Sequence, residues 1–125
     1  MVAERSVRYA AERVPVGIVS GAAREEMDAV LQGAGLVELF GVVVAAEDVP
    51  AGKPDPAGYE RALELLDGIE AGDMLVFEDT DAGISAARAA GMHCVAVEGT
   101  LPRERLAAAD EIVPALDTAL LRRVL

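Results

Sequence analysis

Four short apolar runs, separated by segments of helical periodicity, are the feature that most limits how this chain can fold. The runs are rich in valine and other aliphatic residues, and they are too short to be core helices. Runs of this length between amphipathic segments are typical of strands buried in a parallel sheet. We expect strands at PVGIVS (15–20), GVVVAA (41–46), MLVFE (74–78) and HCVAV (93–97), with a weaker one at EIV (111–113).

The segments between these runs predict helices packed on the sheet. Asp55 is placed to cap a helix whose first position is Pro56, and Gly91 stands where another helix should stop. The expected fold class is α/β, with a doubly wound and mostly parallel sheet in a single domain of residues 1–125. The expected helices are 3–13, 23–33, 56–67, 82–90, 102–109 and 115–123.

The charge balance excludes two classes of partner. The chain has 11 Lys and Arg against 22 Asp and Glu, a formal net charge of -11, which would repel nucleic acid and anionic membranes. No apolar run approaches the roughly 20 residues of a membrane-spanning helix, and the first residues lack the apolar core of a signal peptide. We therefore expect a cytoplasmic protein. Cys94 is the single cysteine and lies in an apolar run, which predicts a buried thiol.

Polar residues follow three of the predicted strands. In a doubly wound sheet, ligands bind beyond the carboxyl ends of the strands. Ser20 and Gly21 follow the first run and offer a hydroxyl and backbone N–H groups to an anion. Lys53 lies in the loop after the second run, and Glu78 and Asp79 end the third. These positions predict one site at one edge of the sheet.

Each of these residues also has a plainer interpretation. Ser20 is placed to cap the helix that follows it, and Lys53 could be an ordinary solvated loop lysine. Asp81 fits an acid favoured by a helix dipole. Glu78 and Asp79 fit that interpretation less well, because a carboxylate at the mouth of a buried sheet needs a compensating cation, either Mg²⁺ or Lys53. Together the residues suit a phosphate with Mg²⁺.

Three motifs in order resemble the haloacid dehalogenase (HAD) superfamily of phosphohydrolases. The resemblance is to its β-phosphoglucomutase and phosphoglycolate phosphatase-like branch, and it extends from about Pro15 to Val97. The motifs are VSGA (19–22), GKPDPAGYERAL (52–63) and VFEDTDAGISAARAAGM (76–92).

The resemblance implies a role for each site residue. Ser20 would hold the transferring phosphoryl group, helped by the backbone N–H of Gly21. Lys53 would neutralise charge between the phosphate and the nucleophile. Asp79 would bind Mg²⁺, with Glu78 beside it as an outer or water-mediated partner. Phosphoryl transfer needs such fixed donors and cations, because charge develops on the equatorial oxygens.

The sequence also departs from the family pattern. HAD enzymes begin with a strand ending in DxDGT, whose first Asp is the nucleophile and whose second is the general acid and base. No such motif precedes Ser20, and the DTD triplet at 79–81 follows Lys53 and continues with Ala82-Gly83 instead of Gly-Thr. The cap domain of this branch is missing as well. The chain therefore resembles the last two-thirds of a HAD core.

The missing strand would lie in the middle of the family's sheet. We expect the strands at 15–20 and 74–78 to flank that place. They would then pair directly, accept a strand from another chain, or leave unpaired edges that favour association. We expect a homo-oligomer, a domain swap, strand donation from another chain, or a monomer that is prone to aggregate.

The sequence thus predicts a HAD-type, Mg²⁺-dependent phosphohydrolase or phosphomutase core acting on a small phosphorylated metabolite. The 125 residues themselves should be nearly inactive, because they lack the nucleophilic Asp. Two alternatives stay open: a non-catalytic phosphate- and metal-binding or assembly module, and half of a split enzyme. A response-regulator receiver is disfavoured because Lys53 precedes the main acids instead of coming late in the chain.

Overall fold

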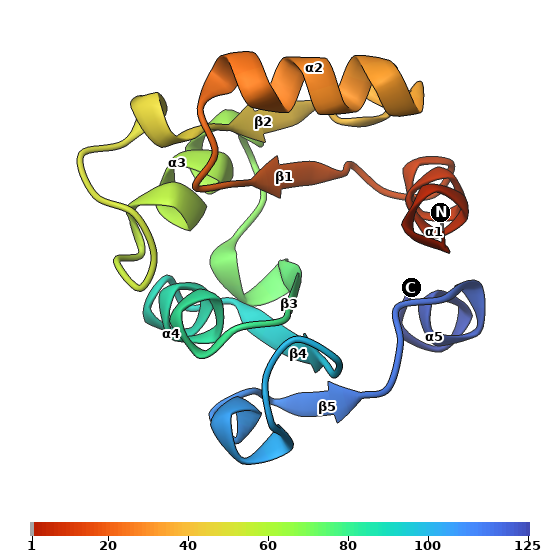
Figure 1. The fold of residues 1–125 in the computed structure, drawn as a ribbon, viewed down its shortest axis with the longest axis vertical. Helices are drawn as coiled ribbons and strands as arrows, with labels where there is room; N and C mark the ends of the chain where they lie inside the picture. The colour runs from red at the N-terminus through yellow and green to blue at the C-terminus, as the bar shows by residue number, and fades with distance from the viewer. Residues whose placement is uncertain (1) are drawn as a thin grey trace.

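The computed structural model describes residues 2–125 and contains every strand that the sequence predicts (Figure 1). The strands are β1 (Gly17–Val19), β2 (Val42–Val44), β3 (Leu75–Glu78), β4 (His93–Val97) and β5 (Glu111–Val113). All of their pairings are parallel. They form two separate sheets, β1-β2 and β3-β4-β5. The expected α/β class and parallel pairing are confirmed.

The helices follow the prediction with one exception. The α-helices are α1 (Val2–Ala11), α2 (Arg24–Ala34), α3 (Ala57–Leu65), α4 (Asp81–Ala89) and α5 (Thr118–Val124). The predicted helix at 102–109 is wrong, because this segment forms only the 3₁₀ turn η4 (Arg103–Leu106), which buries Leu106. The other 3₁₀ turns are η1 (Val37–Leu39), η2 (Ala46–Asp48) and η3 (Ala71–Asp73).

Local signals explain several helix ends. Helix α3 begins at Ala57, one residue later than predicted, and Asp55 Oδ1 accepts the N–H of Ala57 at 2.9 Å. Thr80 caps α4 by accepting the N–H of Gly83. After α4 the chain turns at Gly91, whose φ of 81° favours glycine. No helix within residues 2–125 is long and apolar enough to cross a bilayer.

The first sheet is covered on both faces. Because side chains alternate along a strand, Ile18 and Val43 point to one face and pack against Met27 and Leu31 of α2. On the other face Val19, Val42 and Val44 pack against Ala62 of α3. Helices α2 and α3 therefore lie on opposite sides of β1-β2, as a doubly wound fold requires.

The second sheet repeats this arrangement. Its cluster on one face lies under Ile84 and Ala87 of α4 and includes Val76, Cys94 and Ala96. The cluster on the other face lies under Leu120 of α5 and includes Leu75, Phe77 and Val95. Helix α3 is adjacent to both β1-β2 and α4, while α1 packs against α5 (Figure 1). These helix contacts hold the two sheets together.

The strands β1 and β3 end the two sheets without pairing to each other. Within residues 2–125, β1 has only β2 as a hydrogen-bonded neighbour, and β3 has only β4. Of the alternatives that the sequence leaves, direct pairing of these two strands is therefore excluded. Each strand keeps one edge whose backbone N–H and C=O groups lack a ladder partner in this part of the chain.

Candidate functional site

Ser20 leaves β1 as an extension of the strand, not as a helix cap. Its N–H donates to Val44 O at 2.9 Å, and its hydroxyl oxygen accepts the N–H of Ala22 at 3.0 Å. Helix α2 begins later, with Ala23 at the cap position and no side-chain cap. The helix-cap interpretation of Ser20 is therefore wrong. Among residues 2–125, no acceptor is found for the hydroxyl proton of Ser20.

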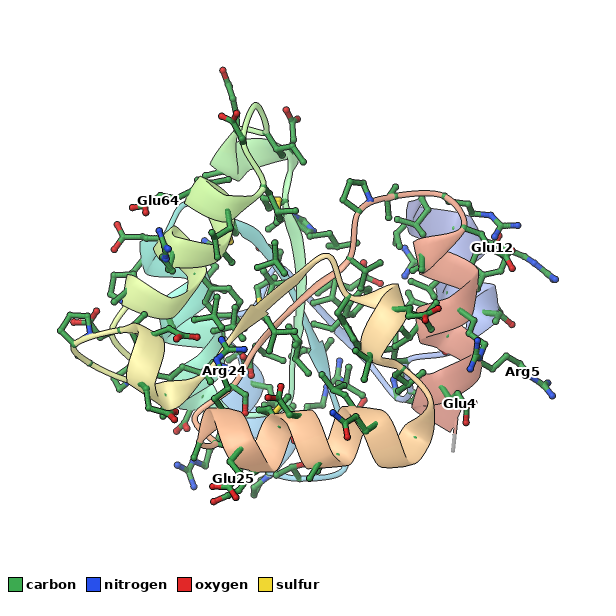
Figure 2. All side chains as sticks on the ribbon, turned by 90° about the horizontal axis from the view of Figure 1, so that it is seen from above. Glu4, Arg5, Glu12, Arg24, Glu25 and Glu64 are labelled. Carbon is green, nitrogen blue, oxygen red and sulfur yellow. The ribbon has the colours of Figure 1, made fainter. Side chains whose placement is uncertain are left out.

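A carboxylate from a distant loop occupies the start of α2 instead. Glu47, in η2, accepts the N–H of Arg24 at 2.8 Å. The Arg24 side chain donates to Val43 O at 2.9 Å and pairs with Asp48, whereas Glu25 points away from the molecule (Figure 2). The hydrogen bond from the Ala45 N–H and the bond from Arg24 hold the pKa of Asp48 below its usual range. These contacts fix the loop that follows β2.

Gly21 lies in open space at the end of β1. It is exposed, and a Cβ added there would meet no atom within 4 Å. No acceptor for its N–H is found among residues 2–125. Ser20 and Gly21 thus present a hydroxyl and an N–H side by side, the two donors that the sequence predicts for phosphate. Their role in binding stays a prediction.

Lys53 connects the ends of the two sheets. Its Nζ donates to Val19 O of β1 at 3.1 Å and to Glu78 Oε1 of β3 at 2.5 Å. Its side chain is only 25% exposed, so the interpretation as a solvated loop lysine is wrong. An ammonium has three N–H donors. Two of them are used by acceptors in the described chain, which leaves one for a ligand.

Glu78 is the buried carboxylate of the site, with 8% of its surface exposed. Its Oε1 accepts from Lys53 and also from the hydroxyl of Tyr59 on α3. Burial, followed by the nearby charge of Glu78, raises the pKa of Tyr59 above its usual range, so Tyr59 stays a hydrogen-bond donor. Lys53 is the cation that compensates the negative charge of this carboxylate. The sequence allowed either Lys53 or Mg²⁺ in that position.

Asp79 and Asp81 have different surroundings. Asp79 is exposed, and its Oδ2 accepts from Thr100 Oγ1 at 2.6 Å. Asp81 begins α4 and pairs with Arg105 at 2.7 Å, and this bond lowers the pKa of Asp81. The structure confirms Asp81 as a helix-start acid. Asp79 follows Glu78 directly, beyond the end of β3.

These acids supply only part of a magnesium site. Mg²⁺ in proteins takes one or two carboxylates together with waters and phosphate oxygens. Asp79 can serve as one such ligand, but Glu78 Oε1 is already engaged by Lys53 and Tyr59. Within residues 2–125, no three His, Cys, Asp or Glu side chains gather as a cation site. Binding of Mg²⁺ by Asp79 and Glu78 stays a prediction.

Sequence reasoning assigned no role to Tyr59 or to Thr100. A signal for Tyr59 exists, because a tyrosine on the buried face of a predicted helix needs a partner for its hydroxyl. It lies within the motif that contains Lys53, six positions further on. Thr100 lies in a loop, and no pattern in the sequence indicates that it reaches Asp79.

Comparison with known proteins identifies the family. Residues 3–91 match the family model of haloacid dehalogenase-like hydrolases. The chain belongs to this family. The match includes Ser20, Lys53 and Asp79, the residues that the resemblance places in the HAD site.

Two curated relatives are phosphatases. Validoxylamine A 7'-phosphate phosphatase of Streptomyces hygroscopicus subsp. limoneus is 42% identical over 101 residues, which are 81% of this chain and 47% of the relative. Fructose-1-phosphate phosphatase of Escherichia coli is 39% identical over 85 residues, 68% of this chain and 45% of the relative. The chain thus spans about half the length of these HAD relatives.

Solved structures place the fold in the same branch. A Thermotoga maritima protein, provisionally assigned as a β-phosphoglucomutase, matches 99% of this chain with a TM-score of 0.85 and 29% identity. The match covers 59% of that protein. A HAD hydrolase of subfamily IA from Geobacter sulfurreducens matches with a TM-score of 0.80 and 26% identity, covering 96% of this chain and 57% of that protein. The chain therefore has the α/β fold of this HAD branch and spans a little over half the length of these two solved structures.

Proposed function

We propose that this chain supplies the phosphate-binding part of a HAD-type phosphohydrolase or phosphomutase that acts on a small phosphorylated metabolite. The observation that carries the proposal is the position of Lys53 Nζ, bonded to both Val19 O and Glu78 Oε1. It puts one positive charge at the carboxyl ends of β1 and β3, where such folds bind ligands. The activities that name the two phosphatase relatives support the same substrate class.

The residues at these strand ends suit the charge of a phosphoryl group. Ser20 offers a hydroxyl donor, Gly21 an N–H, and Lys53 its remaining N–H with a formal positive charge. Preorganised donors of this kind stabilise the oxygens of a phosphoryl group in the transition state. Glu78 would act on the phosphate only indirectly, by holding Lys53.

Mg²⁺ is the cofactor that goes with this family. Asp79 would be its protein ligand here, since its carboxylate is exposed beyond the end of β3. The ion, when bound, supplies positive charge that neutralises the phosphoryl oxygens. Glu78 would approach it only through water, because Lys53 and Tyr59 occupy Oε1.

The proposal places the nucleophile outside these residues. The sequence has no DxDGT before Ser20, and β1 and β3 each leave one sheet edge unpaired in residues 2–125. A further strand between them would bring its last residues next to Lys53. We therefore expect the 125-residue chain alone to bind phosphate weakly and to be nearly inactive.

Two measurements on the purified chain test the proposal. With Mg²⁺ and p-nitrophenyl phosphate, hydrolysis should not exceed background. Calorimetry with Mg²⁺ and inorganic phosphate should show binding that Ser20→Ala weakens. Ser85→Ala is the matched control, because Ser85 is exposed on α4 and should leave binding unchanged.

The outcomes separate the alternatives. Robust turnover that Asp79→Asn abolishes would contradict the absence of a nucleophile, and no phosphate binding would contradict the site itself. Activity restored by a peptide carrying an apolar strand and DxDGT would indicate half of a split enzyme. Binding that persists without any such rescue would favour a non-catalytic module.

A further inference from the structure

Tyr59 contacts both members of the buried ion pair. It lies near the start of α3, with 7% of its surface exposed. Its hydroxyl donates to Glu78 Oε1, and its ring centroid lies 5.3 Å from Lys53 Nζ. A cation over an aromatic face is attracted by the ring, so Tyr59 acts on Lys53 directly as well as through Glu78.

The same carboxylate oxygen receives both donors. Lys53 Nζ lies 2.5 Å from Glu78 Oε1, the oxygen that also accepts from Tyr59. A lysine side chain has four carbons and many rotamers, so a single contact would not hold its ammonium in one place. Here Val19 O, Glu78 and the Tyr59 ring surround Nζ from three elements of the fold.

Close packing leaves these groups little freedom. A Cβ added at Gly58, next to Tyr59, would lie 2.7 Å from Val19 Cγ1, so α3 is pressed against β1. A Cβ added at Gly83 would overlap the Glu78 carboxylate, so Glu78 is pressed against α4. The close approach of α3 to β1 thus restricts where Tyr59 can lie. Through its hydroxyl contact with Glu78, Tyr59 in turn restricts where Lys53 can lie.

We propose that Tyr59 is a positioning residue that holds Lys53 Nζ at the ends of β1 and β3. The hydroxyl fixes Glu78, Glu78 fixes Lys53, and the ring restricts the ammonium from the side. The remaining N–H of Lys53 is then directed before any ligand binds. The use of that N–H for phosphate rests on the proposed function, whereas the immobilisation of Lys53 does not.

The chain offers a direct probe of this proposal, because Lys53 is its only lysine. Expression with ¹³C-lysine gives a single lysine Cε signal, whose NMR relaxation reports the mobility of that side chain. In the unsubstituted protein Cε should be rigid, with an order parameter close to that of the backbone. Tyr59→Phe, which keeps the ring and removes the hydroxyl, should lower it.

The control is Tyr9→Phe, which alters the other tyrosine of the chain, on α1. It should leave the Lys53 order parameter unchanged. A purely structural role for Tyr59 would lower the melting temperature without mobilising Lys53, and that result would overturn the proposal. If Tyr59→Phe does not fold, the order parameter of Lys53 Cε in the unsubstituted protein still tests the proposal. A freely rotating Lys53 side chain in that protein would overturn the proposal as well.

Phosphate binding distinguishes this inference from the proposed function. Calorimetry with inorganic phosphate and Mg²⁺ is repeated on the same variants. A rigid Lys53 that Tyr59→Phe mobilises, in a protein that binds no phosphate, would support the positioning role and contradict the proposed function. If the protein binds phosphate but Tyr59→Phe does not mobilise Lys53, the proposed function is supported and the positioning role of Tyr59 is contradicted.

Discussion

Gly83 faces Glu78 so closely that a Cβ added to Gly83 would lie 1.9 Å from Glu78 Oε2. The carboxylate of the site thus occupies the place where any other residue at 83 would put its side chain. It cannot swing aside freely, because Lys53 and Tyr59 both hold its other oxygen. The first turn of α4 and the end of β3 approach each other only because residue 83 is a glycine.

Gly83→Ala should therefore destabilise the protein despite the better helix propensity of alanine. Crowding of this kind costs about 1–3 kcal/mol in unfolding free energy. Gly33→Ala is the matched control, because Gly33 lies in α2 with open space around its Cα and should gain about 0.5–1 kcal/mol. Urea unfolding of the two variants measures both changes in unfolding free energy. Equal effects at the two positions would contradict the close contact.

The Lys53–Glu78 pair should show strong coupling. Lys53→Met leaves the buried Glu78 carboxylate without its cation, which costs about 3 kcal/mol, the low end of the range for buried pairs because Lys53 is 25% exposed. Glu78→Gln should cost less, because Lys53 retains some contact with water. The double variant should recover most of the loss. Chemical unfolding of the four proteins gives the coupling energy, and additive effects would contradict the pair.

The sequence predicted the strands, and it named Lys53 as a candidate partner of Glu78, for physical reasons. Short runs in which nearly every residue is apolar favour strands that are buried on both faces of a sheet. All five expected strands form. The need of Glu78 for a cation was also evident, with Lys53 as one of two candidates. The role of Tyr59 was not evident, because it depends on how α3 packs between the first sheet and α4.

The errors have a common cause in contacts between distant residues. Ser20 has the right residue type for a helix cap, but Glu47 reaches the N–H of Arg24 from 23 positions away. The segment 102–109 has helical periodicity, but after one turn its chain must bend to start β5. There Asp110 is held by the N–H of Cys94 and by Arg88. Local patterns contain no information on either contact.

Stability should fall at alkaline pH because of Cys94. Burial, together with the charge of Glu78, raises the pKa of its thiol from 9.0 to about 11. Between these values the unfolded chain releases a proton that the folded protein keeps, so unfolding becomes easier as pH rises. The stabilisation is complete below pH 9 and is lost by about pH 11. Tyr59, with its raised pKa, acts in the same direction.

Cys94→Ala isolates this contribution. The variant should lose less unfolding free energy than the unsubstituted protein between pH 9 and about 11, whatever its absolute stability. In the folded protein at neutral pH the thiol, which is fully buried, should also resist disulfide reagents. Identical pH slopes for the two proteins, or rapid labelling of the native thiol, would contradict this account.

Asp110 should contribute to loss of stability in acid. The N–H of Cys94, followed by the bond from Arg88, holds its pKa below the usual 3.8. Its stabilisation is therefore present above about pH 4 and is lost as pH falls through the lower, folded-state value. Asp110→Asn keeps an acceptor for Cys94 but loses the charge. Its stability should depend less on pH below 4, and thermal melts across that range provide the measurement.

The unpaired edges of β1 and β3 predict self-association. Backbone N–H and C=O groups at a sheet edge are ready to pair with another chain. Light scattering should therefore show a molar mass that rises with protein concentration. A short synthetic peptide of alternating valine and isoleucine with lysine ends should compete for the edges. It should lower that mass and raise the melting temperature, because a ligand that binds only the folded state stabilises it.

A proline-containing peptide of otherwise equal composition is the control for this experiment. It offers the same hydrophobicity but cannot complete the ladder, since proline lacks the N–H donor. It should leave both the mass and the melting temperature unchanged. If the protein stays monomeric at all concentrations, and neither peptide changes its melting temperature, its strand edges do not accept a further strand. An equal response to both peptides would indicate general hydrophobic binding, and the proposed place of a further strand between β1 and β3 would lose its support.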